Sequence, residues 1–155
     1  MRNGFTLIEL IISIGIVAII SSIGFINLVG YNQRKNIGLV GQEVVAVLRS
    51  AQNYSTSQES GSQWGVHFEN STSSEEIDFY ELFAGSSYSG STVMQKVPLE
   101  SGVIFSSPST GESLDIVFSA VTGLPGASST IKVTVSGNES VSSTIIINSN
   151  GQIQY

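Results

Sequence analysis

A single carboxylate lies inside an apolar stretch near the N-terminus. Glu9 follows Phe5, Leu7 and Ile8, and it precedes Leu10–Val29, a stretch without any charged residue. On insertion scales, an ionisable side chain within a membrane segment costs about 2.5–3.5 kcal/mol, and it indicates a functional role with a charged partner. The alternative is a carboxylate that stays near the lipid headgroups and barely enters the membrane. From physical chemistry alone, both interpretations of Glu9 stay open.

The rest of the chain offers little for catalysis. His67 is the only histidine. Its alternation with Trp64, Val66 and Phe68 predicts a strand whose apolar face points away from His67, so we expect a solvated histidine. A Ser-His-Asp set has no support beyond the many serines. We predict no catalytic residue, and the sequence favours a protein that is not an enzyme.

A group of acidic residues raises the question of calcium, which takes oxygen ligands. Their spacing matches no known calcium loop, and we favour a solvated acidic face over a metal site. The chain has no cysteine, which excludes a disulfide scaffold, a thiolate metal site and a thiol nucleophile. We predict no metal and no cofactor. The acidic group is Glu69, Glu75, Glu76, Asp78 and Glu81.

Charge argues against nucleic acid as a partner. The net charge is −6, and only 12% of the residues are charged. After Lys35, the basic residues are Arg49, Lys96 and Lys132. Such a chain lacks the basic surface that attracts phosphate backbones.

The apolar stretch predicts a membrane segment. About 20 apolar residues in a helix cross a hydrocarbon core of about 30 Å. A cleaved secretory signal would have a shorter apolar run and a small-x-small site, and Ser21 and Ser22 are the nearest candidates for such a site. A plain signal anchor fits the length, and a buried core helix is also conceivable. None of these three interpretations explains Glu9.

Residues 2–10, Arg-Asn-Gly-Phe-Thr-Leu-Ile-Glu-Leu, resemble the class III signal sequence of type IV pilins and pseudopilins. The resemblance implies that a prepilin peptidase cleaves between Gly4 and Phe5 and N-methylates the new amino group of Phe5. It also implies that Glu9 pairs with the Phe5 amine of a neighbouring subunit and so sets the assembly register. A carboxylate and an ammonium group in a low-dielectric site offset much of each other's desolvation cost.

One feature of the apolar stretch differs from the family, and another leaves the orientation of the chain in the membrane open. Many major pilins have a proline within the apolar helix, whereas here Ile26 occupies that region and the first proline is Pro98. Basic residues flank both ends of the apolar stretch, so their distribution does not choose an orientation. The cytoplasmic leader is taken from the resemblance.

The helix is expected to continue beyond the apolar stretch, from about residue 5 to about residue 58. Glycines weaken it at Gly38 and Gly41, and Gly61 is a plausible terminator. Apolar residues mark one face of an amphipathic helix. They are Ile37, Val40, Val44, Val47, Leu48 and Ala51.

About eight strands are expected after the helix, and Asn150-Gly151 predicts a tight hairpin turn between the last two. One long helix followed by strands predicts an α+β fold, in which the helix, transmembrane in its first half and amphipathic in its second, packs on antiparallel β-sheet. The expected strands are 64–68, 77–84, 92–97, 103–106, 114–118, 131–135, 144–148 and 152–155.

Leu48-Arg49-Ser50-Ala51-Gln52 resembles a signature of the type II secretion H subunit and the FimT-like minor pseudopilins, although a more basic residue is expected at position 52. The resemblance implies a helix packed on two sheets. It also implies four segments: a leader (1–4), a transmembrane and filament-core helix (5–30), its amphipathic continuation (31–60) and a β-rich domain (61–155).

The function implied is a minor structural subunit of a type IV pilus-like or type II secretion filament. Its expected partners are other pilin subunits, prepilin peptidase, the inner-membrane assembly platform and the membrane itself. It is expected as a single-pass protein of the inner membrane with its domain outside the cytoplasm, and then in a filament in the periplasm or at the cell surface. The alternatives are a membrane-anchored, adhesin-like binding domain and, less favoured, an anchored hydrolase.

Overall fold

The protein is described by a computed structural model that covers residues 5–73 and 76–155, with the backbone alone for residues 23–29. The chain forms two compact units, residues 1–35 and residues 36–155. The helix α1 (Leu7–Thr56) contributes to both units, and each unit is considered separately.

In the first unit, α1 begins with a side-chain cap. The backbone N–H of Glu9 donates to Oγ1 of Thr6 at 3.3 Å, and the N–H of Leu10 donates to the Thr6 carbonyl at 3.2 Å. A threonine in this position satisfies one of the free N–H groups of the first turn. The sequence Thr-Leu-Ile-Glu therefore fixes where the helix begins.

Among the described residues, no helix is both long enough and apolar enough to span a membrane. The span predicted over residues 5–30 includes residues 23–29, whose side chains lie outside that part, and it stays a prediction.

In the second unit, α1 buries the predicted apolar face. Val44, Leu48 and Ala51 are completely buried, and Ile37 and Val40 are 3% exposed. The spacing of these residues, three or four apart, puts them on one side of the helix. Val45 is also buried, which the pattern does not predict.

The helix ends at Thr56, earlier than the glycine suggested by the sequence. Gln58 adopts the left-handed conformation with φ 54°, and a short 3₁₀ turn, η1 (Glu59–Gly61), follows. The Ser55 carbonyl accepts the N–H of Gln58 and that of Val121, while the Ser55 hydroxyl accepts the N–H of Trp64 at 2.8 Å. These contacts, rather than Gly61, end the helix.

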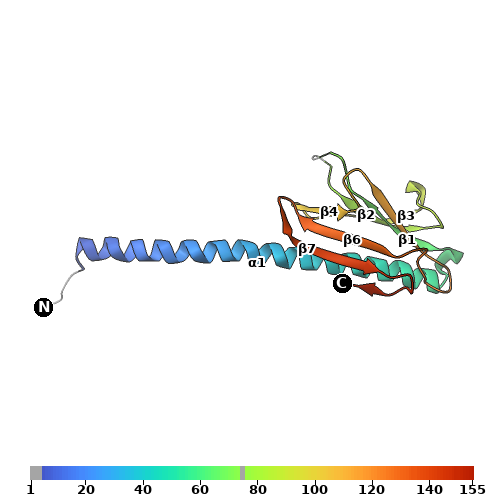
Figure 1. The fold of residues 1–155 in the computed structure, drawn as a ribbon, viewed down its shortest axis with the longest axis horizontal. Helices are drawn as coiled ribbons and strands as arrows, with labels where there is room; N and C mark the ends of the chain where they lie inside the picture. Colours follow the sequence, from blue (N-terminus) through green and yellow to red (C-terminus); the bar gives the residue numbers. More distant parts are fainter. Residues whose placement is uncertain (1–4, 74–75) are drawn as a thin grey trace. The chain divides into compact units, whose positions relative to one another are not determined.

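Within the described residues, eight strands form two antiparallel four-stranded sheets (Figure 1), as the sequence predicts. The first has the order β3-β2-β1-β5 and the second the order β4-β6-β7-β8. The first sheet contains β1 (Trp64–Glu69), β2 (Phe79–Ala84), β3 (Val93–Pro98), which follows the 3₁₀ turn η2 (Gly90–Thr92), and β5 (Ser113–Phe118). The second contains β4 (Val103–Ser107), β6 (Ser129–Val135), β7 (Asn138–Ile147) and β8 (Ile153–Gln154).

The strand β7 begins earlier than expected. The sequence predicts it only from residue 144, but Asn138, Ser142 and Ser143 also pair with β6, with Ser143 opposite Val133. Their polar composition hides them from a hydrophobicity pattern. At the other end, the Asn150-Gly151 turn is present, with Gly151 at φ 81° and Ile147 opposite Ile153.

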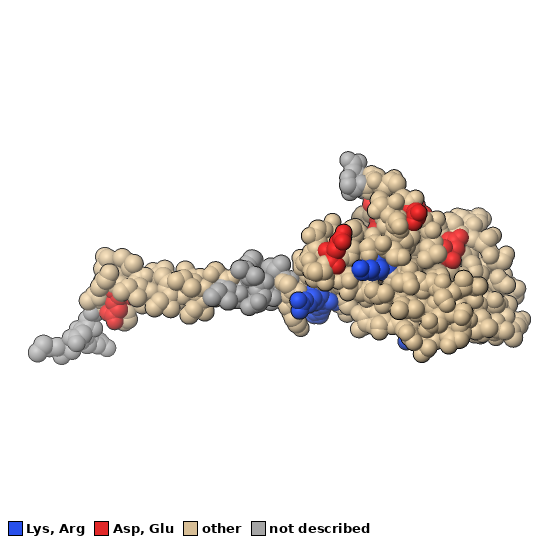
Figure 2. All heavy atoms as spheres, in the orientation of Figure 1, with Lys and Arg blue, Asp and Glu red and all other residues tan. Residues whose placement is uncertain are grey.

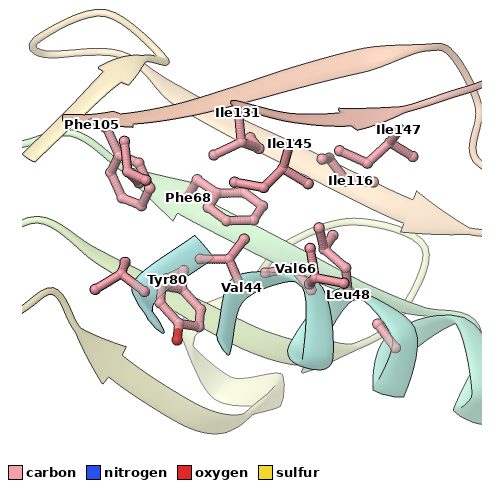
Figure 3. Packing of buried hydrophobic residues seen from close by; sticks show 14 of the residues in the cluster. Val44, Leu48, Val66, Phe68, Tyr80, Phe105, Ile116, Ile131, Ile145 and Ile147 are labelled. Atoms are coloured by element: carbon pink, nitrogen blue, oxygen red, sulfur yellow. The ribbon is translucent and has the colours of Figure 1, made fainter. Parts of the chain in front are cut away.

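The core lies where the second part of α1 and the two sheets meet. Figure 3 shows Val44 and Leu48 of α1, Val66 and Phe68 of β1 and Ile131 of β6 pointing into one cluster. Phe68 meets Phe105 of β4 edge to face at 5.7 Å. Each large apolar side chain buried in this way contributes about 1.5–3 kcal/mol, so packing holds the helix and the sheets of this unit together.

Two buried polar side chains tie the sheets to each other. Asp78 accepts the N–H of Ser71 at 3.0 Å and that of Phe105 at 2.8 Å. Asn70 donates to the carbonyls of Phe105 and Pro108. Asn70 directly follows β1 and Asp78 directly precedes β2, and both side chains bond to Phe105 of β4 in the second sheet. They therefore fix one end of the two-sheet assembly.

Candidate functional site

The N-terminal segment presents Phe5 just outside the helix. Phe5 has no helical structure and is 75% exposed. It directly precedes Thr6, the residue that caps α1. Gly4, the other residue of the predicted cleavage site, lies outside the described residues, as does the rest of the predicted leader.

Glu9 lies in the first turn of α1 with an exposed side chain. A carboxylate is favourable there because the N-terminus of a helix has a partial positive charge. Within the described part of the chain, no ion pair involves Glu9. Its carboxylate is therefore available to a cationic group from outside that part.

The helix surface around Glu9 is apolar and exposed. The neighbours Leu7 and Ile8 are 76% and 62% exposed. Such a surface is a site for lipid or for another protein. It continues along the same helix, where each of the following side chains is more than half exposed: Leu10, Ile11, Ile12, Ile14, Ile16, Val17, Ile19 and Ile20.

A second polar group crosses the first sheet. Register pairs place Lys96 beside Glu81, Glu81 beside His67 and His67 beside Asp115. We call these four residues, one from each strand, the charge row. Within it, Lys96 Nζ lies 3.1 Å from Glu81 and His67 Nδ1 lies 2.6 Å from Asp115.

His67 points away from the Trp64 face as predicted, but the expectation of a solvated histidine is wrong. His67 is only 5% exposed. The segment between β2 and β3 folds over it, and the ring of Tyr88 stacks on the imidazole at 3.7 Å. The second ring nitrogen, Nε2, lies 3.2 Å from Glu69. His67 is buried by this covering segment, which lies elsewhere in the sequence, so the alternation of residues within β1 could not indicate the burial.

Tyr88 fastens this covering segment to β2. Its hydroxyl donates to Glu81 Oε2 at 2.5 Å, and its ring meets Phe83 edge to face. The hydrogen bond to Glu81, aided by burial and by nearby carboxylates, raises the pKa of Tyr88 to about 12. Glu81, which accepts the hydrogen bond and pairs with Lys96, is itself 5% exposed. The geometry supports a structural role for this group.

Two of the acidic residues do not lie on the solvated face that the sequence suggests, whereas Glu76 is exposed. Asp78 and Glu81 are buried, because one accepts backbone N–H groups and the other pairs with Lys96 and Tyr88. Glu75 lies outside the described residues. Within residues 5–73 and 76–155, no cluster of histidine and acidic side chains is arranged to hold a metal ion. Charged side chains are sparse on the face drawn in Figure 2.

The segment Leu48–Gln52 has a packing role. Leu48 and Ala51 are completely buried. The Gln52 side chain donates to the carbonyls of Gly123 and Gly151, each at 2.9 Å. The amide therefore serves as the hydrogen-bond donor at the position where a basic residue is expected.

Comparisons with known proteins give a sequence motif and a likeness of fold. The family described as the prokaryotic N-terminal methylation motif matches residues 1–25. The chain has a pilin-like fold and carries this methylation motif. No curated protein matches the sequence closely enough to count as a relative.

Two solved structures resemble this pilin-like chain, both of the type IV minor pilin FimU of Pseudomonas aeruginosa. One superimposes with a TM-score of 0.56 at 15% identity, covering 80% of this chain and 90% of FimU. The other, from a second crystal form, has a TM-score of 0.52 at 15% identity, covering 74% and 87%. At this identity the likeness concerns the fold, which is the helix on antiparallel sheet that the sequence predicts.

The motif indicates several general features of the function of this pilin-like chain. It implies processing by a prepilin peptidase, attachment to a membrane and assembly with other pilin subunits. Motif and fold together indicate a structural subunit, a class of protein that is generally not an enzyme.

Sequence reasoning missed residues whose partners are distant in the chain. Tyr88 lies among serines and glycines, and Asn70 and Asp78 lie in a polar loop. An isolated tyrosine in such a segment is the one signal that could have indicated a covering contact, because aromatic rings are usually buried.

Proposed function

We propose that the chain is a minor structural subunit of a filament of the type IV pilus or type II secretion pseudopilus class. The observation that carries the proposal is the methylation motif over residues 1–25, which includes Phe5 and Glu9. The FimU-like fold supports it. In the proposal, the N-terminal helix is the membrane anchor before assembly and the filament core afterwards.

Prepilin peptidase removes residues 1–4 and methylates the amino group of Phe5. The position of Phe5 supports this step, because an exposed residue just before the helix cap is not held by the helical hydrogen bonds of α1. After cleavage, the new amino group lies one helical turn from Glu9 along the sequence.

Glu9 then receives the Phe5 amine of a neighbouring subunit. A carboxylate among exposed apolar side chains is costly in lipid, and an ammonium group from another copy offsets that cost in one register only. The exposed carboxylate in the first turn, without an ion pair in the described part of the chain, supports this role.

Replacing the carboxylate tests the assembly role. Glu9→Gln keeps the size of the side chain and removes its charge, and Glu9→Ala removes both. In the native host, we expect both variants to be cleaved normally and to be strongly depleted from the sheared filament fraction, measured by quantitative immunoblotting. Glu43→Gln, at an exposed position of the same helix, is the matched control and should assemble normally.

The outcome decides between the two interpretations of Glu9. Normal incorporation of Glu9→Gln would refute the pairing and leave the carboxylate as a favourable group at the helix N-terminus. Absence of the unaltered chain from every filament fraction of its host would instead support an anchored binding domain and refute the filament proposal.

A further inference from the structure

A tyrosine and two basic residues follow the apolar part of α1. Tyr31 is 65% exposed, and Arg34 and Lys35 are exposed as well. The two basic residues stand three and four positions after Tyr31 in one continuous helix, a spacing that puts the three side chains on one face. We call these three residues, which all lie in the first unit, the basic cluster.

The charges of the basic cluster are not neutralised within the described part of the chain. No ion pair there includes Arg34 or Lys35. Along the helix, the nearest acidic residues are Glu9 and Glu43, and neither stands at the three- or four-residue spacing at which helix side chains pair. Two adjacent cations in a chain of net charge −6 are therefore available to an anionic partner from outside that part.

The position of the basic cluster along the helix indicates the kind of partner. Residues 10–30, between Glu9 and Tyr31, contain no charged side chain. At 1.5 Å per residue this helical segment is about 32 Å long, and the hydrocarbon core of a bilayer is about 30 Å thick. In a membrane crossed by this segment, the basic cluster lies at the level of the lipid headgroups on the side opposite to Glu9.

The three side chains have the chemistry that suits this depth. Tyrosine is enriched where the hydrocarbon meets the headgroups, because its ring is apolar and its hydroxyl is polar. Arginine and lysine extend their apolar stems along the hydrocarbon and place their charges among the headgroups. The guanidinium group also donates paired hydrogen bonds to a phosphate. Basic residues next to a membrane segment attract anionic lipids in particular.

We propose that the basic cluster binds the headgroups of anionic phospholipids in the leaflet opposite to Glu9, with Tyr31 at the hydrocarbon boundary. The proposal rests on the proposed membrane anchor, and it adds the class of lipid and the residues that select it. Lysine and arginine are usually in excess on the cytoplasmic side of a membrane segment. Contact with anionic headgroups compensates for their presence on the other side.

Fluorescence energy transfer measures which lipids surround this part of the helix. The native chain has no cysteine, so Asn36→Cys, at an exposed position beside the basic cluster, receives one donor dye. The full chain is reconstituted in phosphatidylcholine vesicles with a small, equal fraction of acceptor-labelled phosphatidylglycerol or acceptor-labelled phosphatidylcholine, each labelled on the acyl chain. From the transfer efficiency, we expect a several-fold higher acceptor density around the donor for phosphatidylglycerol.

Replacing the charges tests whether the basic cluster selects the lipid. Arg34→Gln together with Lys35→Gln removes both charges, and the preference for phosphatidylglycerol should disappear. Arg34→Lys together with Lys35→Arg keeps both charges and should keep most of the preference. Arg49→Gln, at an exposed position farther along the same helix, is the matched control and should change nothing. Salt at about 1 M, which reduces the screening length to about 3 Å, should also remove the preference.

The outcomes separate this inference from the membrane anchor on which it rests. Equal transfer to both acceptors, or a preference that survives the loss of both charges, would overturn the headgroup contact, while transfer itself would still support the anchor. Transfer to neither acceptor would refute the headgroup contact and the anchor together. If the neutral double variant kept the lipid preference but were lost from filaments, the basic cluster would be a contact with another subunit and not with lipid.

Discussion

At the scale of single residues, Gln52 joins three parts of the second unit. Its amide, on α1, donates to the carbonyls of Gly123, between β5 and β6, and of Gly151, between β7 and β8. Both glycines have positive φ angles, 63° and 81°, which their turns require and other residues rarely adopt. One side chain thus positions two turns on the helix.

Replacing Gln52 should show that the amide is needed as a hydrogen-bond donor. Gln52→Leu keeps the bulk and leaves both carbonyls without this donor, and we expect a loss of about 1–2 kcal/mol in unfolding free energy. Gln52→Arg keeps N–H donors and should lose less. Guanidinium unfolding of the full chain in mild detergent, followed by the fluorescence of the single tryptophan, Trp64, measures both. Equal losses for the leucine and arginine variants would contradict this role.

Tyr88 makes the stability depend on alkaline pH. Its pKa is about 12 in the folded protein and 10.0 as the ordinary value. The folded state therefore keeps the phenol proton to a higher pH than the unfolded state does. The resulting stabilisation is complete below pH 10 and is lost as the pH rises toward 12.

Comparing Tyr88→Phe with the unaltered chain isolates this effect. Between pH 9 and pH 11.5, the unfolding free energy of Tyr88→Phe should fall less than that of the unaltered chain, although the variant is less stable at pH 9. If the unfolding free energies of Tyr88→Phe and of the unaltered chain fell equally over this pH range, the hydrogen bond to Glu81 would not hold the phenol proton.

At the scale of elements, the close fit of β1 to its neighbours depends on Gly65. A Cβ atom at this position would lie 2.7 Å from Phe83 Cζ and 2.8 Å from the backbone oxygen of Ile116. Phe83 is completely buried between Gly65 and Tyr88. The absent side chain therefore makes room for the contacts that cover the charge-row face of the sheet.

Gly65→Ala should consequently destabilise the sheet. The backbone oxygen of Ile116 cannot move aside, and overpacking of this kind costs about 1–3 kcal/mol. Gly126→Ala is the matched control, because a Cβ atom there meets nothing within 4 Å. The Trp64 fluorescence midpoint in guanidinium should fall for Gly65→Ala only, and equal midpoints for the two variants would contradict the packing.

Elements whose apolar residues follow a regular period were predictable from the sequence. The buried face of α1 beyond residue 36 and the inward residues of β1 follow from spacing alone. The polar beginning of β7 and the covering segment at Tyr88 were not predictable, because pairing and burial there depend on residues distant in the chain. Gly38 and Gly41, interpreted as weak points, accommodate Tyr155, whose hydroxyl donates to the Gly38 carbonyl.

At the scale of the whole molecule, the two units have different surfaces. Residues 7–20 form a helix with exposed apolar side chains and one acidic group, Glu9. Residues 36–155 bury many of their apolar side chains in one core. The methylation motif lies in the first unit and the FimU-like sheets in the second. The candidate site at Phe5 and Glu9 was identifiable from sequence because its motif is contiguous, unlike the charge row, which four strands assemble.

The mature N-terminus tests the central proposal most directly. The chain is purified from membranes of its native host, and its N-terminal peptide is examined by mass spectrometry. The proposal predicts that residues 1–4 are absent and that the chain begins with N-methylated Phe5. An intact Met1, or a chain beginning near Ser22, would contradict it.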